Sequence, residues 1–157
     1  MLIRPLELKD RDAIARILCQ GDTFTEKEIQ VALELVDDVL KHPSHLDYHI
    51  YSAVLPPETV AGFICFGPVP LTDDSFDLYW IAVDNRQFKN GIGSRLVAFM
   101  EDIVRGKAGR QIYVDTSSTP PYAAARSFYE KHGYRIVCVL DDFYRHGDHK
   151  VQFQKRL

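Results

Sequence analysis

Two glycines separated by a single residue give the first chemical signal in the sequence. Gly91 and Gly93 follow the strand-like run "FDLYWIAVD" and precede apolar residues at helical spacing. The first N–H groups of a helix have no intrahelical partner and carry the positive end of the helix dipole. Glycine lets a backbone approach a ligand closely. The pattern therefore predicts an anion-binding helix N-terminus, flanked by the positive charges of Lys89 and Arg95.

The loop lacks the residues of two common phosphate-binding motifs. A P-loop needs Gly-Lys-Ser/Thr, whereas Gly93 is followed by Ser94 and Arg95. A dinucleotide-binding fingerprint needs a third glycine after an early strand, and this segment has neither. A tight strand-to-helix turn without a ligand remains the alternative from the loop alone.

Composition indicates one globular domain over residues 1–157, with 46% hydrophobic residues and 26% charged residues. The net charge of -3 argues against a general nucleic-acid binder, whose surface is normally basic. No segment approaches the ~20 apolar residues of a membrane span, and the N-terminus does not resemble a signal peptide. We therefore expect a cytoplasmic protein with no nucleic-acid or membrane partner.

Cysteines and histidines do not predict a metal site. Three widely spaced cysteines, each in an apolar run, favour buried and reduced thiols: Cys19, Cys65 and Cys138. The spacing of His42, His45 and His49 is suggestive, but Pro43 prevents a helix there and favours a solvated loop.

The order of elements predicts an α+β layer fold with a mixed sheet. Thr25 and Glu28 form a capping box before a long amphipathic helix that ends near Pro43. The strand before the glycine loop and the strand at 110–117 flank one helix, so they should run parallel. The expected strands lie at 2–6, 48–55, 60–69, 75–84, 110–117, 134–144 and 149–157.

In this context the sequence resembles the GNAT superfamily of acyl-CoA-dependent N-acetyltransferases. The matching segments are "LYWIAVDNRQFKNGIGSRLVAFMED" and "AAARSFYEKHGY", and the resemblance covers nearly the whole chain. It implies a mostly antiparallel sheet of about seven strands, splayed between the fourth and fifth, with about four helices. Two positions depart from the family pattern: Phe88 replaces an Arg or Gln, and Tyr122 replaces an Asn.

The resemblance also implies a site. Acetyl-CoA would be the co-substrate, with its pantetheine arm along the strand backbone near Ile81 and Val83. A backbone N–H near Ala82 or Val83 would polarise the thioester carbonyl. The residues expected to bind acetyl-CoA are Ile81, Ala82, Val83, Lys89, Asn90, Gly91, Ile92, Gly93, Ser94, Arg95 and Tyr122.

Two residues are expected to be catalytic. Tyr129 matches the family tyrosine that protonates the departing thiolate, although an ordinary half-buried tyrosine is the alternative. Asp115, near the end of its strand, is the candidate proton acceptor, although capping of the next turn is equally typical of aspartate. An ordered water could replace it as the base.

We therefore expect an N-acetyltransferase that moves an acetyl group to a primary amine by direct attack in a ternary complex. The alternative is a non-catalytic acyl-CoA-binding sensor or docking module, which Phe88 and Tyr122 favour. The hairpin "DDFYRHGDHK" could line the acceptor side, where Asp141, Asp142 and Tyr144 would favour a cation. The acceptor could be a small molecule or a peptide, and a homodimer is an open option.

Overall fold

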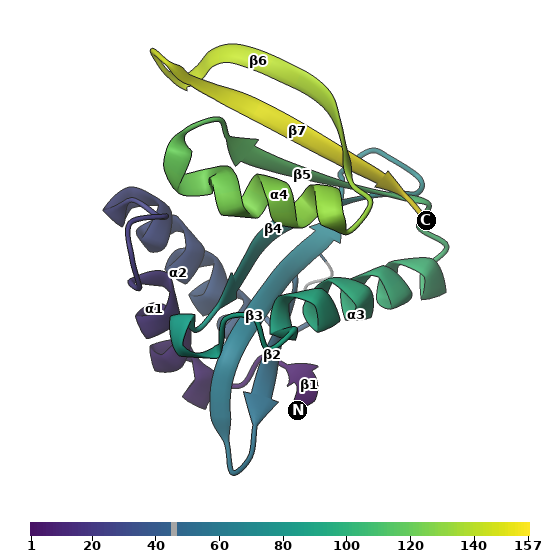
Figure 1. Cartoon of the computed structure of the whole chain (residues 1–157). Helices are drawn as coiled ribbons and strands as arrows, with labels where there is room; N and C mark the ends of the chain where they lie inside the picture. Colours follow the sequence, from purple (N-terminus) through teal and green to yellow (C-terminus); the bar gives the residue numbers. More distant parts are fainter. Residues whose placement is uncertain (45–46) are drawn as a thin grey trace.

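A computed structural model describes residues 1–44 and 47–157, so His45 lies outside the described residues. One mixed sheet runs through the molecule in the order β1-β2-β3-β4-β5-β7-β6 (Figure 1). Its strands are β1 (Leu2–Pro5), β2 (His49–Leu55), β3 (Thr59–Pro68), β4 (Ser75–Val83), β5 (Gln111–Ser117), β6 (Arg135–Arg145) and β7 (Asp148–Arg156). Only β4 and β5 pair in parallel, as the sequence predicts.

Helices cover both faces of this sheet. They are α1 (Arg11–Leu18), α2 (Glu26–Lys41), α3 (Ile92–Gly106) and α4 (Ala123–Lys131), with short 3-10 turns η1 (Leu8–Asp10), η2 (Asn85–Gln87) and η3 (Pro120–Tyr122). Side chains of α1 and α2 pack into one buried cluster with β2 and β3, and those of α3 and α4 pack into another. The predicted fold class is confirmed.

The parallel pairing of β4 and β5 is short, and it ends inside both strands. Ser75, Phe76 and Asp77 pair with residues 111–113 of β5, and the ladder stops there. Immediately afterwards β4 carries a bulge, since Tyr79 has no counterpart between Cys65 and Phe66 of β3. A bulge bends a strand and increases its twist. The second half of β4 therefore leaves β5, and a wedge opens between them, as expected.

Local sequence signals explain the elements that border this wedge. The Thr25 and Glu28 capping box is present at the start of α2, with Glu28 N–H donating to Thr25 Oγ1. The end of β4 leads into η2, where Asp84 accepts hydrogen bonds from the backbone and guanidinium of Arg86. Gly91 at the start of α3 has φ +74°, a left-handed conformation that favours glycine.

Some local predictions need correction. Only Cys65 is buried, whereas Cys19 is exposed and Cys138 is half-buried, so the expectation of three buried thiols is wrong. Among the described residues, no group of three His, Cys, Asp or Glu side chains could hold a metal ion. In the same part of the chain, no helix is long and apolar enough to cross a membrane.

Asp84 should stabilise the segment before the glycine loop in a pH-dependent way. Its hydrogen bond to Arg86 is the main reason that its pKa falls to about 2, below the value of about 3.9 in an unfolded chain. The stabilisation is therefore full above about pH 4 and is lost as pH falls through about 2. We expect Asp84→Asn to lower the free energy of unfolding by about 2 kcal/mol at pH 7.

Urea denaturation between pH 7 and pH 2 would measure this difference. Asp102→Asn, at an exposed ion pair with Arg105, is the control and should change stability by less than about 0.5 kcal/mol. A constant difference between Asp84→Asn and wild type down to pH 2 would contradict the assignment.

Candidate active site

The wedge between β4 and β5 opens into a cavity of about 780 Å³. One wall is the second half of β4, and the opposite wall is the end of β5 with η3 and α4. Of the predicted site residues, the cavity is lined by Ile81, Ala82, Val83, Gly93, Asp115, Tyr122 and Tyr129. The other loop residues do not line it: Lys89, Asn90, Gly91, Ile92, Ser94 and Arg95. The structure therefore brings both predicted catalytic residues to the predicted acyl-binding strand.

The backbone of β4 presents hydrogen-bonding groups to this cavity. Asp84 N–H donates to the carbonyl of Ala61 at 2.8 Å, which directs the backbone of Asp84 toward β3. The direction of the backbone N–H and C=O groups alternates along an antiparallel pair. Those of Ala82 therefore also point toward β3, and those of Ile81 and Val83 point toward the β5 side. The β4–β5 ladder has ended by then. The N–H groups of Ala82 and Val83 were the two candidates to polarise the thioester carbonyl. Only that of Val83 points toward the cavity, so it is the better candidate.

The N-terminus of α3 is available to an anion. The N–H of Arg95 donates to the carbonyl of Gly91, and helix geometry leaves the three preceding N–H groups without an intrahelical partner. Within the described chain, no hydrogen bond occupies the N–H groups of Ile92, Gly93 or Ser94. The side chain of Ile92 is in the core, so only its backbone can contact a ligand.

Close packing against α4 gives a second reason for a glycine at position 93, besides the freedom of its backbone. A Cβ atom at Gly93 would lie 3.3 Å from the ring of Phe128 on α4, which is tighter than ordinary packing. Nearby, His132 Nδ1 donates to the carbonyl of Phe128, and its Nε2 lies 2.9 Å from Ser94 Oγ. These contacts hold the start of α3 against α4. The hydroxyl of Ser94 is thereby engaged, so its N–H is the group left for an anion.

The ring of Tyr129 is held by packing, while its hydroxyl group has no hydrogen-bond partner among the described residues. Its ring packs against Phe153 and Tyr134, with centroids 5.6 and 6.0 Å away, while the residue also lines the cavity. Its hydroxyl makes no hydrogen bond to any residue that the structure describes. Burial raises the pKa of Tyr129, so the phenol stays protonated at neutral pH. It can therefore donate a proton but not accept one.

Asp115 is exposed and already has partners. Lys150 and Gln152 of β7 contact its two carboxylate oxygens, the amide of Gln152 at 2.9 Å. The predicted capping of the following turn is not made by this side chain, because Thr119 N–H donates to Ser117 Oγ instead. To accept a proton, Asp115 would have to weaken its ion pair with Lys150. Its role as the base stays a prediction.

Aromatic and acidic side chains close the other end of the cavity, and of these the sequence had indicated Tyr122 but not Glu28 or Phe24. Tyr122 donates from its hydroxyl to Glu28 Oε1 at 2.6 Å, joining η3 to α2 across the cleft. Burial would raise the pKa of Glu28, but hydrogen bonds from Tyr122 and Thr25 outweigh it and lower that pKa. Phe24 packs between Trp80 and Tyr122 beside this contact.

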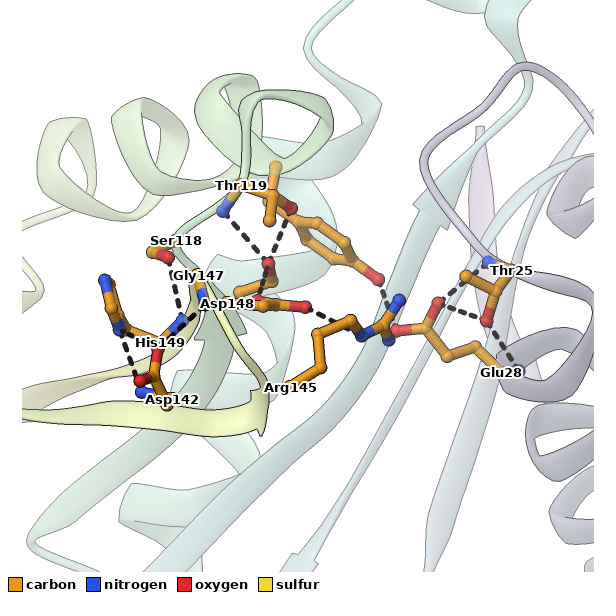
Figure 2. Close-up of polar contacts among 11 residues, drawn as sticks. Thr25, Glu28, Ser118, Thr119, Asp142, Arg145, Gly147, Asp148 and His149 are labelled. Atoms are coloured by element: carbon orange, nitrogen blue, oxygen red, sulfur yellow. Dashed lines mark hydrogen bonds and ion pairs between the residues drawn. The ribbon is translucent and has the colours of Figure 1, made fainter.

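The β6–β7 hairpin supplies the remaining wall. Asp148 is buried, accepts a hydrogen bond from Ser117 Oγ and lies 3.5 Å from Arg145 Nε. Figure 2 shows Arg145 extending from the hairpin toward Glu28. Tyr144 lines the cavity as the hairpin interpretation expects, but Asp141 and Asp142 do not. Asp142 instead accepts from the N–H of Gly147 at the turn.

The sequence pattern around Glu28 and Asp148 indicated local structure rather than a functional site. Glu28 was visible only as a capping-box residue, and Asp148 only as part of a turn. Nothing in one sequence relates Glu28 to Tyr122, 94 residues later. Their contact exists because the fold brings α2 and η3 to the same cavity.

Comparison with known proteins agrees with this geometry. Residues 47–136 match the family model described as an acetyltransferase (GNAT) domain. The chain belongs to the GNAT acetyltransferase family. Members of this family are acyltransferases that use acetyl-CoA. Comparison with curated proteins finds no match.

Solved structures resemble the whole chain. A protein from Desulfovibrio desulfuricans described as belonging to the GNAT family has 36% identity and a TM-score of 0.93 over 99% of this chain and 98% of its own. An aminoglycoside 6'-N-acetyltransferase complexed with coenzyme A has 22% identity and a TM-score of 0.79, covering 99% and 97%. The ribosomal-protein-S18-alanine N-acetyltransferase from Escherichia coli has 19% identity and a TM-score of 0.75, covering 99% and 92%. The last two show the fold alone.

Gly93→Val should impair both acetyl-CoA binding and stability, because it disturbs the packing at the start of α3. The added side chain must displace Phe128, so we expect acetyl-CoA binding to weaken about tenfold and stability to fall by about 1–3 kcal/mol. Isothermal titration and thermal unfolding measure the two effects. Gly106→Ala on the same helix is the control, because its Cβ would meet no atom within 4 Å. Unchanged binding by Gly93→Val would argue against a site at this helix start.

Proposed function

We propose that this protein transfers an acetyl group from acetyl-CoA to a primary amine by direct attack in a ternary complex. The observation that carries the proposal is the parting of β4 and β5 beyond Asp77, which opens one cavity that both Val83 and Tyr129 line. The free N–H groups at the start of α3 support binding of the pyrophosphate there. Lys89 and Arg95, both exposed near this loop, add positive charge.

Electrostatics of the acceptor end support a cationic amine. Four carboxylates line the cavity, those of Asp22, Glu28, Asp115 and Asp148. Lys150 pairs with Asp115 and Arg145 with Asp148, so Asp22 and Glu28 are the two that form no ion pair with a described residue. Such a wall favours a positively charged substrate through Coulomb attraction. The aromatic rings of Trp80, Tyr122 and Tyr144 would pack on its apolar part or face its charge. Among the amines that remain open are small molecules and peptide N-termini.

In the proposed mechanism, each step is assigned to a group of this chain. The acceptor ammonium first loses a proton to Asp115 or to an ordered water. The amine lone pair attacks the thioester carbonyl carbon, and the N–H of Val83 stabilises the negative charge that develops on oxygen. When the carbon–sulfur bond breaks, Tyr129 gives its proton to the thiolate, and the second proton that the amine nitrogen loses on becoming an amide restores the phenol. An amide and free CoA are the products.

An amine panel tests the proposed activity directly. Release of free CoA from acetyl-CoA should exceed the hydrolysis background with at least one cationic primary amine, and mass spectrometry should find an acetylated product. Polyamines, aminoglycosides and short peptides cover the size range of the cavity. Binding of acetyl-CoA without turnover of any amine would favour the sensor alternative instead.

Tyr129→Phe tests the proton donor in the same assay. Loss of the hydroxyl should lower kcat about 100-fold, while the dissociation constant of acetyl-CoA stays within about twofold. Tyr113→Phe, also on the β5 side of the fold but outside the cavity, is the matched control. Equal turnover by Tyr129→Phe and wild type would remove Tyr129 from the mechanism.

Asp115→Asn tests the proton acceptor through the pH profile. If Asp115 is the base, kcat/KM at pH 7 should fall about 100-fold. The loss should shrink toward pH 10. There, an ammonium group with a pKa of about 10.4 increasingly loses its proton to solvent without help from Asp115. Asp12→Asn at an exposed site on α1 is the control. An unchanged profile would assign proton acceptance to water.

A further inference from the structure

A hydrogen-bonded histidine joins the end of α4 to the first turn of α3. His132 follows the last residue of α4, and its ring centroid lies 4.2 Å from that of Phe128, one helical turn earlier. His132 Nδ1 lies 2.7 Å from the carbonyl oxygen of Phe128, and Nε2 lies 2.9 Å from Ser94 Oγ. Both ring nitrogens are therefore engaged, one of them at the helix start where the pyrophosphate is proposed to bind.

The carbonyl of Phe128 decides which ring nitrogen of His132 carries a hydrogen. A carbonyl oxygen can only accept, so the hydrogen is on Nδ1. In the neutral ring Nε2 is then an acceptor, and the hydroxyl of Ser94 donates its single hydrogen to it. When the ring takes up a second proton, Nε2 becomes a donor to Ser94 Oγ. The hydroxyl hydrogen of Ser94 is then released to point toward another acceptor.

The Ser94 side chain lies beside the backbone groups proposed to hold the pyrophosphate. Ser94 is the third residue of α3, and helical side chains lean toward the N-terminus of their helix. Its hydroxyl therefore lies on the same side as the free N–H groups of Ile92 and Gly93. With neutral His132, Ser94 Oγ presents only lone pairs to an anion there. With protonated His132, it presents an O–H donor, and a positive charge lies one hydrogen bond further away.

No other charged side chain of the described residues forms an ion pair with His132. The charged residues on neighbouring positions and elements are Arg95, Glu130, Lys131, Arg135 and Lys155. Lys155 of β7 is held by Glu101, and the other four are exposed to water. The position of His132 at the C-terminal end of α4 favours a cation, because the negative end of the helix dipole lies there.

We propose that His132 is a positioning residue for acetyl-CoA: protonation of its ring turns the Ser94 hydroxyl into a donor to the pyrophosphate, so proton uptake and acetyl-CoA binding favour each other. The inference rests on the proposed function, because it concerns the same acyl-donor site. Imidazole groups ordinarily titrate near about pH 6.5, so the coupling acts in the neutral range. Because such coupling is reciprocal, acetyl-CoA should bind more tightly below this pH than above it.

Isothermal titration with acetyl-CoA between about pH 5.5 and pH 8.5 tests this coupling. The dissociation constant of wild type should rise about tenfold over the range, the scale of one hydrogen bond to a charged group. His132→Gln keeps a hydrogen-bonding group that does not titrate, and Ser94→Ala removes the hydroxyl, so both should lose most of the rise. The phosphate monoester of the ligand titrates near about pH 6 in every titration, so the comparison between variants removes its contribution.

His42→Gln is the matched control. His42 is exposed at the end of α2 and does not line the cavity, so this variant should keep the wild-type pH profile. Thermal unfolding confirms that each variant is folded. A histidine that only fastened α4 to α3 would affect the melting temperature but not the pH profile of binding.

Repeating the titrations in buffers of different ionisation enthalpy counts the protons directly. At pH 7, wild type should take up about half a proton more per acetyl-CoA bound than His132→Gln does. Equal proton uptake and equal pH profiles in these two proteins would overturn the inference and leave the acyl-donor site in place. A wild-type profile retained by Ser94→Ala would also overturn it, because the hydroxyl would then not be involved. Failure of acetyl-CoA to bind wild type at any pH would overturn the proposed function as well.

Discussion

The early end of one hydrogen-bonded ladder determines the rest of this structure. β4 and β5 pair over three residues of each strand, and beyond Asp77 and Tyr113 they separate. The backbone groups that a continuous sheet would have paired then face an open wedge. Unpaired buried backbone groups cost free energy unless a partner satisfies them. The bulge at Tyr79 directs this separation, and the pairing of β5 with β7 along its whole length keeps the other wall rigid.

The two ends of the cavity use different kinds of group. Toward α3, the available groups are main-chain N–H groups, which are the same whatever side chains stand nearby. The exposed Phe88, which stands where the family pattern has a polar residue, therefore leaves the proposed pyrophosphate site at these N–H groups intact. Toward α2 and the hairpin, the cavity is lined by side chains such as Glu28, Asp148 and Tyr122.

Polar contacts across the acceptor end tie distant parts of the chain together. Tyr122 links η3 to Glu28 of α2, and Ser117 links β5 to Asp148 of β7. Asp148 is buried and Glu28 is half-buried, and a hydrogen bond to a charged group is stronger than one between neutral groups. The cavity is therefore held open by its own walls. Of these four residues, the sequence analysis connected only Tyr122 to the site, and it expected a contact with acetyl-CoA rather than with Glu28.

The sequence by itself determined the elements and the strand–loop–helix corner at which acetyl-CoA is predicted to bind. Apolar periodicity, the Thr25–Glu28 capping box and the glycines at 91 and 93 are local signals, because they act over one or two helical turns. The parallel crossing from β4 to β5 followed from the handedness of strand–helix–strand connections. Tertiary structure alone decided that Asp115 is held by Lys150, that Gly93 packs closely against Phe128, and that Glu28 and Asp148 line the cavity. These contacts join residues far apart in the chain, and a distance between packed elements is not encoded in the spacing of either one.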